Sequence, residues 1–276
     1  MATQLVPLPE VERLSASVIR ILGGNPGKRI LIDTGEGKPA WAASLQSVLS
    51  EEKATVHQAL LTHWHGDHVN GLADLQRICP TAQVFKHQPD DGQTDIQDGQ
   101  VFRVEGATLT ALHTPGHTVD HMAFVLEEED AMFTGDNVLG HGTAVFEDLK
   151  VYLSSLNRMR DRVQGRGYPG HGAVIENTTA RVAEYIQHRQ QREDEVLRVL
   201  RHGSLDVVPD EPSPERRRTW TPIELVKQIY RNVPENLHLP ASHGVLKVLM
   251  KLEEEGRTVH DSKSGAWSLA GEKSAL

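Results

Sequence analysis

The stretch THWHGDH, residues 62 to 68, places three histidines and an aspartate within seven residues of chain. The preceding TVHQALL is rich in β-branched and apolar residues and predicts a strand, and the following VNGLADLQRIC has the apolar spacing of a helix. On an extended segment alternate side chains share a face, so His63 and His65 are expected to address one spot. A glycine then lets the chain turn, and Asp67 and His68 address a second spot nearby. One loop between a strand and a helix can thus supply ligands to two metal sites.

Further ligands must come from elsewhere, because so short a loop cannot complete two coordination shells. Three motifs at the ends of predicted strands offer them: TPGHT contains His117, FTGDN contains Asp136 and YPGHG contains His171. A glycine beside each candidate lets the backbone turn tightly and approach a metal. Imidazole and carboxylate ligands suit zinc, with manganese or iron as alternatives.

These side chains form a chemically sufficient set for two ions, and we expect two Zn²⁺, with Mn²⁺ as the alternative at one or both positions. Catalytic two-metal sites hold their ions about 3.5–4 Å apart and share a water. A purely structural metal site is the competing interpretation, but structural zinc sites are usually closed and mononuclear. The expected ligands are His63, His65 and His117 for one ion, Asp67, His68 and His171 for the other, and Asp136 as the bridge.

The composition narrows the class of protein. The chain has 276 residues, of which 38% are hydrophobic, and a formal net charge of −9. This charge gives no general attraction to nucleic acid or to an anionic membrane. No apolar run approaches the roughly 20 residues of a membrane span, and no signal peptide is recognisable at the N-terminus, so we expect a cytoplasmic protein. The single cysteine, Cys79, excludes an intramolecular disulfide and a multi-cysteine zinc site.

The order of strand and helix patterns predicts a layered α/β fold. Several neighbouring strands look antiparallel, which favours layered sheets over a doubly wound parallel sheet. A polar stretch rich in proline and arginine, residues 202–218, predicts a linker, and two helices and a hairpin follow it. We expect a catalytic domain over residues 1–200, and a linker with a winged-helix-like appendage over residues 201–276. The predicted strands cover residues 17–22, 29–35, 55–63, 83–87, 100–106, 107–114, 121–129 and 130–136, and the predicted helices 39–49, 69–79, 145–163, 177–201, 220–233 and 238–256.

The motifs THWHGDH, TPGHTVDH, FTGD and YPGHG resemble, one by one, the ligand motifs of the metallo-β-lactamase superfamily. In LIDTG, Asp33 matches the usual early aspartate of that superfamily. The resemblance extends over nearly the whole chain. It implies an αββα sandwich with a dinuclear metal site along one edge.

A narrower lactamase-like group is indicated by LGHGTAVFEDL and by the long C-terminal segment that begins at TPIELVKQIY. This group includes fungal thioesterases that release aromatic polyketides from the acyl carrier protein of non-reducing polyketide synthases. It also includes a mitochondrial endoribonuclease specific for single-stranded RNA. The segments HRQQRED and NLHLPASHGVL resemble the fungal thioesterases more closely than the nuclease. The resemblance therefore implies an acyl carrier protein and a polyketide thioester as partners.

The chain departs from this group near its beginning. In the group, the counterpart of GGNPG is followed by a segment containing a TLQGTNTY-like strand, whereas here Lys28 runs directly into Arg29. Relative to the group, we expect about one hairpin to be absent beside the mouth of the site. All expected metal ligands lie downstream, so metal binding should survive, while folding stability and substrate contacts are expected to be affected.

We expect a metal-activated hydroxide to attack a carbonyl, with Asp67 as the catalytic residue that ligates, orients the nucleophile and shuttles its proton. A thioester suits such a site because a thiolate leaves with little acid catalysis.

RNA cleavage is the alternative function. Against it, acidic residues outnumber basic ones between residues 193 and 276, and the cluster Arg216, Arg217 and Arg218 is the only basic run there. An inactive metal-binding or interaction module is the third hypothesis.

The sequence leaves the roles of several residues outside the ligand set open. His121 could support the site from outside the ligand set or be structural, and His141 could line the pocket or form a structural turn. Trp64 and Phe146 could each pack in the core or line the pocket. The apolar spacing in the C-terminal helices predicts packing, and this appendage could also narrow the substrate entrance or mediate a homodimer.

Overall fold

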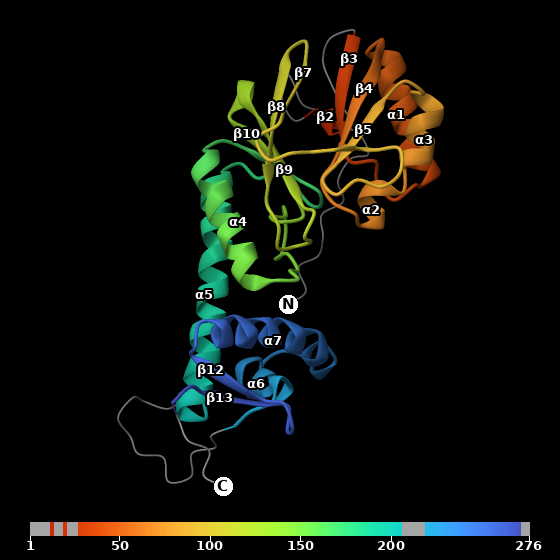
Figure 1. Ribbon diagram of the computed structural model, residues 1–276. Coiled ribbons are helices and arrows are strands. Elements are labelled where there is room, and N and C mark those ends of the chain that lie inside the picture. The colour runs from red at the N-terminus through yellow and green to blue at the C-terminus, as the bar shows by residue number, and fades with distance from the viewer. Residues whose placement is uncertain (1–11, 14–18, 21–26, 206–218, 272–276) are drawn as a thin grey trace. The chain divides into compact units, whose positions relative to one another are not determined.

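A computed structural model describes residues 12–13, 19–20, 27–205 and 219–271 (Figure 1). The chain divides into two compact units: the first holds residues up to 146 together with 151–183, and the second holds 147–150 and the chain from 184 onward. The domain boundary expected at residue 200 stays a prediction. None of the helices in the described residues has the length and apolar character needed to cross a membrane.

The first sheet of unit 1 is parallel and carries the histidine-rich loop. Its strands follow the order β3-β4-β5-β6, with β3 at Gly27–Ile32, β4 at Ala54–Leu61, β5 at Gln83–Lys86 and β6 at Thr94–Asp95. Helix α1, Pro39–Glu51, connects β3 to β4 and begins with a proline at a position where no amide hydrogen is needed. The carboxyl end of β4 therefore leads straight into the loop.

The second sheet of unit 1 is mostly antiparallel and follows the order β11-β10-β9-β8-β7. Only the pair β10–β11 is parallel in it. The loops that carry the other candidate ligands follow β8, β10 and β11. The strands are β7 at Val101–Val104, β8 at Ala107–His113, β9 at Met122–Leu126, β10 at Ala131–Gly135 and β11 at Gly167–Pro169.

Two hydrophobic clusters hold the layers together. One cluster joins residues of both sheets, among them Leu60, Phe85 and Phe124, and forms the core between the sheets. The other, which includes Leu45 and Leu75, packs α1 and α3 (Leu72–Ile78) on the outer face of the first sheet. Helix α4, Leu149–Arg162, lies beside the second sheet (Figure 1). The expected αββα layering is confirmed.

One predicted helix differs from the observed structure. The helix expected over residues 69–79 is split into α2, Gly66–Val69, and α3, which begins at Leu72. Gly71 lies between them, where a Cβ atom would come within 2.0 Å of the carbonyl oxygen of Thr34. The close approach of the chain after β3 therefore breaks the helical pattern and brings the residues after β3 to α2.

Unit 2 contains the described C-terminal elements. Helix α6, Pro222–Ile229, is capped by Glu224, whose carboxylate accepts hydrogen bonds from the amide and hydroxyl of Thr221. The antiparallel hairpin pairs β12 with β13, and Trp220 adds a backbone bridge to Trp267. The two predicted helices and the hairpin are confirmed. The remaining elements are the end of α5 (Thr178–His202), η2 (Glu235–Leu237), α7 (His238–Glu254), β12 (Thr258–Asp261) and β13 (Ala266–Leu269).

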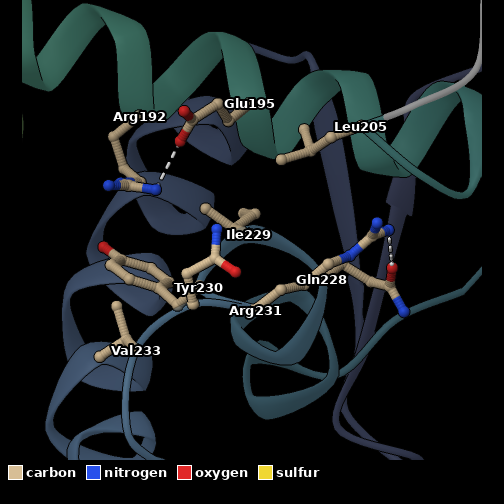
Figure 2. Close-up of a pocket in the computed structure, with 9 residues that line it drawn as sticks. Arg192, Glu195, Leu205, Gln228, Ile229, Tyr230, Arg231 and Val233 are labelled. Carbon is tan, nitrogen blue, oxygen red and sulfur yellow. Dashed lines mark hydrogen bonds and ion pairs between the residues drawn. The ribbon is translucent and has the colours of Figure 1, made fainter.

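A pocket of about 400 Å³ lies within unit 2, between α5 and the end of α6 (Figure 2). Its charged groups are already paired. Arg192 forms an ion pair with Glu195 and stacks over the ring of Tyr230, and Arg231 donates to Gln228. The basic cluster Arg216, Arg217 and Arg218 lies outside the described residues.

Candidate metal centre

The loop after β4 presents its side chains through a sharp change of backbone direction. His63 is fully buried, and His65 is the extended residue that precedes α2. The amide of His68 donates to the carbonyl oxygen of His65 at 2.9 Å, which closes the turn. The extended segment and the first helical turn therefore place two sets of side chains at adjacent positions.

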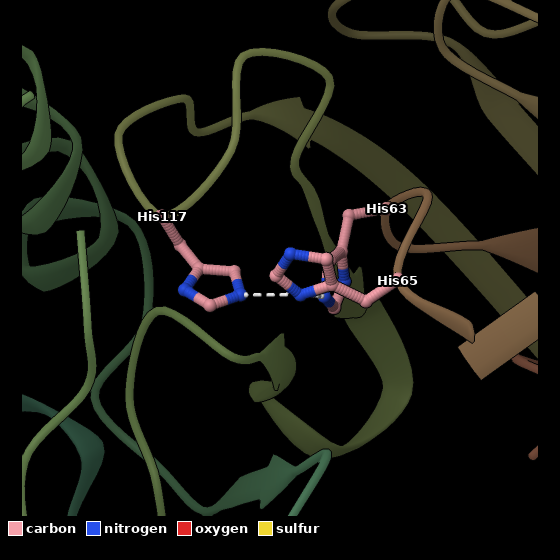
Figure 3. Close-up of side chains that lie close together, drawn as sticks. All are labelled: His63, His65 and His117. Atoms are coloured by element: carbon pink, nitrogen blue, oxygen red, sulfur yellow. Dashed lines mark hydrogen bonds between the residues drawn. The ribbon is translucent and has the colours of Figure 1, made fainter. Parts of the chain in front are cut away.

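Three histidines converge from two segments of the chain (Figure 3). Nε2 of His63 and Nδ1 of His65 lie 2.9 Å apart, and Nε2 of His117 lies 3.1 Å from the same Nδ1. The potential ligand atoms of this trio all lie within 4.8 Å of one another. Such spacing suits three nitrogen ligands around one divalent ion.

A second group lies beside the first. Nε2 of His171 is 3.3 Å from Nε2 of His68 and 3.1 Å from a carboxylate oxygen of Asp67. Oδ2 of Asp136 is 3.4 Å from His171 and 3.8 Å from His117, so this carboxylate lies between the two groups. All seven residues expected as ligands are thus brought together, while their individual assignment stays a prediction.

Hydrogen bonds outside the cluster orient the imidazoles. Asp33 accepts from His68 Nδ1 at 2.7 Å and from the hydroxyl of Thr62 at 2.8 Å, and that hydroxyl is 2.9 Å from His63 Nδ1. The carbonyl oxygen of Val145 accepts from His117 Nδ1 at 2.8 Å. When one ring nitrogen donates outward, the other presents its lone pair to a metal.

Burial and neighbouring charge set the protonation of these groups. Burial lowers the pKa of His63, and it also lowers that of His117. For His68, burial acts to lower the pKa, but hydrogen bonds and charge from Asp136 and Asp33 outweigh it and raise the pKa to about 10. For Asp136, burial opposes ionisation, yet the His171 and His68 partners hold the pKa well below its usual range. His63 and His117 are therefore neutral, and the Asp136 carboxylate is ionised.

The residues fit metal binding. Oδ1 of Asp136 is buried and lies 3.5 Å from Nε2 of His68, but it makes no well-formed hydrogen bond within the described residues. A buried carboxylate oxygen without a well-formed hydrogen bond is costly unless a cation satisfies it. The imidazoles of the trio, with their ring nitrogens converging on the same space, provide the donor set that zinc prefers.

His121, which the sequence left open, is a supporting residue. It is fully buried, and burial holds its pKa well below the usual value. Its Nε2 accepts the backbone amide of Asp136 at 3.1 Å, and its Nδ1 lies 2.9 Å from the hydroxyl of Thr114. The neutral ring therefore holds Asp136 in place. Its position four residues after His117 was the only signal in the sequence.

Two family models match the chain. A family model described as the metallo-beta-lactamase superfamily matches residues 12–171. The chain belongs to the metallo-beta-lactamase superfamily. A second model, described as a beta-lactamase associated winged helix domain, matches residues 221–267. Membership of this superfamily and the His/Asp groups together indicate metal binding.

Solved structures of this superfamily share the fold. A metallo-beta-lactamase family protein from Thermus thermophilus superposes with a TM-score of 0.65 at 24% identity, covering 96% of each chain. A beta-lactamase domain protein from Burkholderia ambifaria superposes with a TM-score of 0.70 at 17% identity, covering 87% of this chain and 82% of that chain. The predicted fold class is confirmed.

Curated relatives are similar along most of the chain. A protein of Aspergillus chevalieri named atrochrysone carboxyl ACP thioesterase is 42% identical and covers 98% of this chain and 92% of its own length. Lactamase-like protein adaB of Aspergillus niger is 44% identical, covering 90% of this chain and 84% of its own length. Lactamase-like protein nscB of Arthroderma gypseum is 45% identical, covering 91% and 86%.

Proposed function

We propose that this chain is a metal-dependent thioesterase that releases an aromatic polyketide from the acyl carrier protein of a non-reducing polyketide synthase. The observation that carries the proposal is the 42% identity, over 98% of the chain, to a protein named as an ACP thioesterase. The metal-ligand cluster adds chemical support, because its residue types are those used for hydrolysis at paired metals. The acyl carrier protein and the polyketide thioester are the proposed partners.

The seven clustered residues would hold two Zn²⁺ ions, with Mn²⁺ as the alternative. His63, His65 and His117 would hold one ion, and Asp67, His68 and His171 the other, with Asp136 shared. Bound ions would supply an activated water at neutral pH and a Lewis acid for a carbonyl oxygen.

The side chains around this site would orient the attacking water, accept its proton and admit the substrate. Asp67, whose side chain is 44% exposed, can orient the attacking water and accept its proton from the solvent-facing side of the cluster. His171 lies beside it and is 40% exposed, so an incoming thioester can reach this end of the site. The departing thiolate needs little general-acid assistance, since a free thiol has a pKa of about 8.5.

Apolar side chains next to the histidine trio suit an aromatic acyl group. Trp64 stands between two expected ligands and is 52% exposed, and its ring centroid is 4.5 Å from that of His65. Val145, whose carbonyl oxygen orients His117, has an exposed side chain. The exposed Trp64 ring does not belong to the core, so we propose that it contacts the acyl group.

The test is hydrolysis of an acyl-carrier-protein thioester and of single-stranded RNA by zinc-loaded and manganese-loaded protein, each compared with Asp67→Ala. We expect thioester turnover only, with kcat lowered at least about 100-fold in the variant, as for removal of a catalytic proton-transfer group. RNA cleavage without thioester turnover would move the chain to the nuclease alternative. Metal-loaded protein that hydrolyses neither substrate would favour an inactive module or an effect of the segment expected to be absent after Lys28.

A further inference from the structure

A buried ion pair joins residues from the segments that carry the histidine trio without supplying a ligand to it. Nζ of Lys86 is 2.8 Å from Oδ2 of Asp120, and the two side chains are 5% and 2% exposed. Asp120 stands between His117 and His121 in the chain. In the chain, Asp120 is therefore three residues after one expected ligand and next to the ring that holds Asp136.

The Lys86 ammonium and the other oxygen of the Asp120 carboxylate, Oδ1, each make additional hydrogen bonds, whereas Oδ2 of Asp120 has only the ion pair with Lys86 among the described residues. The Lys86 ammonium also donates to the carbonyl oxygens of Gln88 at 2.8 Å and His87 at 3.3 Å. The Asp120 carboxylate accepts from the hydroxyl of Thr118 at 2.7 Å. Gln88 adopts a left-handed backbone conformation, with φ of 54°, in the turn that supplies one of these oxygens. These hydrogen bonds offset part of the cost of burying the two charges.

The pair joins the two parts of the chain that supply the histidine trio. Lys86 is the last residue of β5 and is the register partner of Leu61, two residues before His63. Asp120 belongs to the loop between β8 and β9 of the other sheet. A backbone hydrogen bond of 2.7 Å from Met122 to Thr62 forms a second polar link at the same junction.

A buried ion pair contributes little net stability compared with apolar residues of the same shape, but it has strict geometric requirements. We propose that Lys86 and Asp120 are positioning residues that set the separation between His117 and the pair His63 and His65. The inference rests on the proposed metal centre. Its observable is the affinity and geometry of metal binding, which can be measured without substrate.

The test is the double variant Lys86→Met with Asp120→Asn, which removes both charges and keeps similar side-chain volumes. Zinc affinity would be measured by chelator competition, ligand geometry by the visible absorption of Co²⁺-loaded protein, and folding by thermal unfolding of the metal-free protein. The matched control is Lys251→Met with Glu193→Gln in unit 2, where a similarly buried pair is 2.7 Å apart.

We expect the Lys86/Asp120 double variant to fold, to bind zinc about 10- to 100-fold more weakly and to show altered Co²⁺ bands, as for loss of residues that orient ligands. The control should leave both metal readouts unchanged. Wild-type zinc affinity and Co²⁺ bands in the double variant would overturn the inference, as would an equal effect of the control.

Misfolding of the double variant and failure of the proposed function can each be told apart from failure of the positioning role. If the double variant does not fold, Thr118→Val removes one hydrogen bond to Asp120 and keeps both charges, and a severalfold loss of zinc affinity is expected from it. Unchanged zinc affinity in Thr118→Val would then overturn the inference. If wild-type protein binds zinc but hydrolyses no thioester, the proposed function fails while the positioning role is still measured.

Discussion

The replacement Gly170→Ala tests the fit between the cluster and a metal most sharply. A Cβ atom at this position would lie 2.4 Å from Oδ1 of Asp136 and 2.8 Å from Cε1 of His68. Ordinary carbon contacts begin at about 3.5 Å, so the carboxylate must move by roughly 1 Å. The backbone of Gly170 is not in the left-handed conformation, so the effect comes from the added methyl group and not from backbone strain.

The expected loss is in metal affinity. Displacing groups that set ligand geometry lowers affinity about 10- to 100-fold, which is about 1.4–2.8 kcal/mol of binding free energy. Overpacking should destabilise the metal-free protein by about 1–3 kcal/mol. Zinc affinity would be measured by chelator competition, and stability by urea unfolding of the metal-free protein.

Gly244→Ala provides the control for this experiment. Gly244 lies within α7, and no atom lies within 4 Å of the position that its Cβ would take. We expect this substitution to stabilise the chain by about 0.5–1 kcal/mol and to leave zinc affinity unchanged. Unchanged zinc affinity in Gly170→Ala would refute the placement of Asp136 as a shared ligand.

Three further predictions concern the substrate, pH and the metal. Trp64→Ala should raise KM about tenfold for an aromatic acyl thioester, the loss expected from about 1.4 kcal/mol of stacking. KM for an acetyl thioester should change little, and an equal effect on both substrates would contradict a contact between Trp64 and the acyl group. Because zinc must replace a proton on His68, whose pKa is raised to about 10, affinity at that position should rise between pH 7 and pH 9. Affinity at the trio should stay flat over this range, since burial lowers the pKa values of His63 and His117; competition titrations at each pH would show two slopes, and one common slope would contradict the assignment. Zinc at 100 times its dissociation constant should stabilise the protein by about 2.7 kcal/mol over the chelator-treated form in urea unfolding, and no difference would argue against binding.

The candidate ligands could be found from the sequence because each has a local signal. The spacing HxHxDH points side chains of one loop toward two metal positions, and glycines mark the strand ends that carry His117, Asp136 and His171. The short strands β6 and β11 have too few residues for a periodic pattern. The split between α2 and α3 arises from the contact of Gly71 with Thr34, which no local pattern reveals.

The supporting groups depend on contacts between distant segments. Lys86 and Asp120 are 34 positions apart, and neither belongs to a metal-binding spacing. Asp33 was found only through its family motif, whereas its bonds to His68 and Thr62 are visible in the folded chain. Side-chain pairing across two sheets is thus the part of the site that a single sequence does not reveal.

The most direct test of a dinuclear thioesterase is the rate of hydrolysis of an aromatic acyl-carrier-protein thioester as zinc is added to metal-free protein. We predict a rate that rises until about two zinc ions are bound per chain and is abolished by a chelator. Full activity without metal, or saturation of metal binding with no thioester turnover, would contradict it.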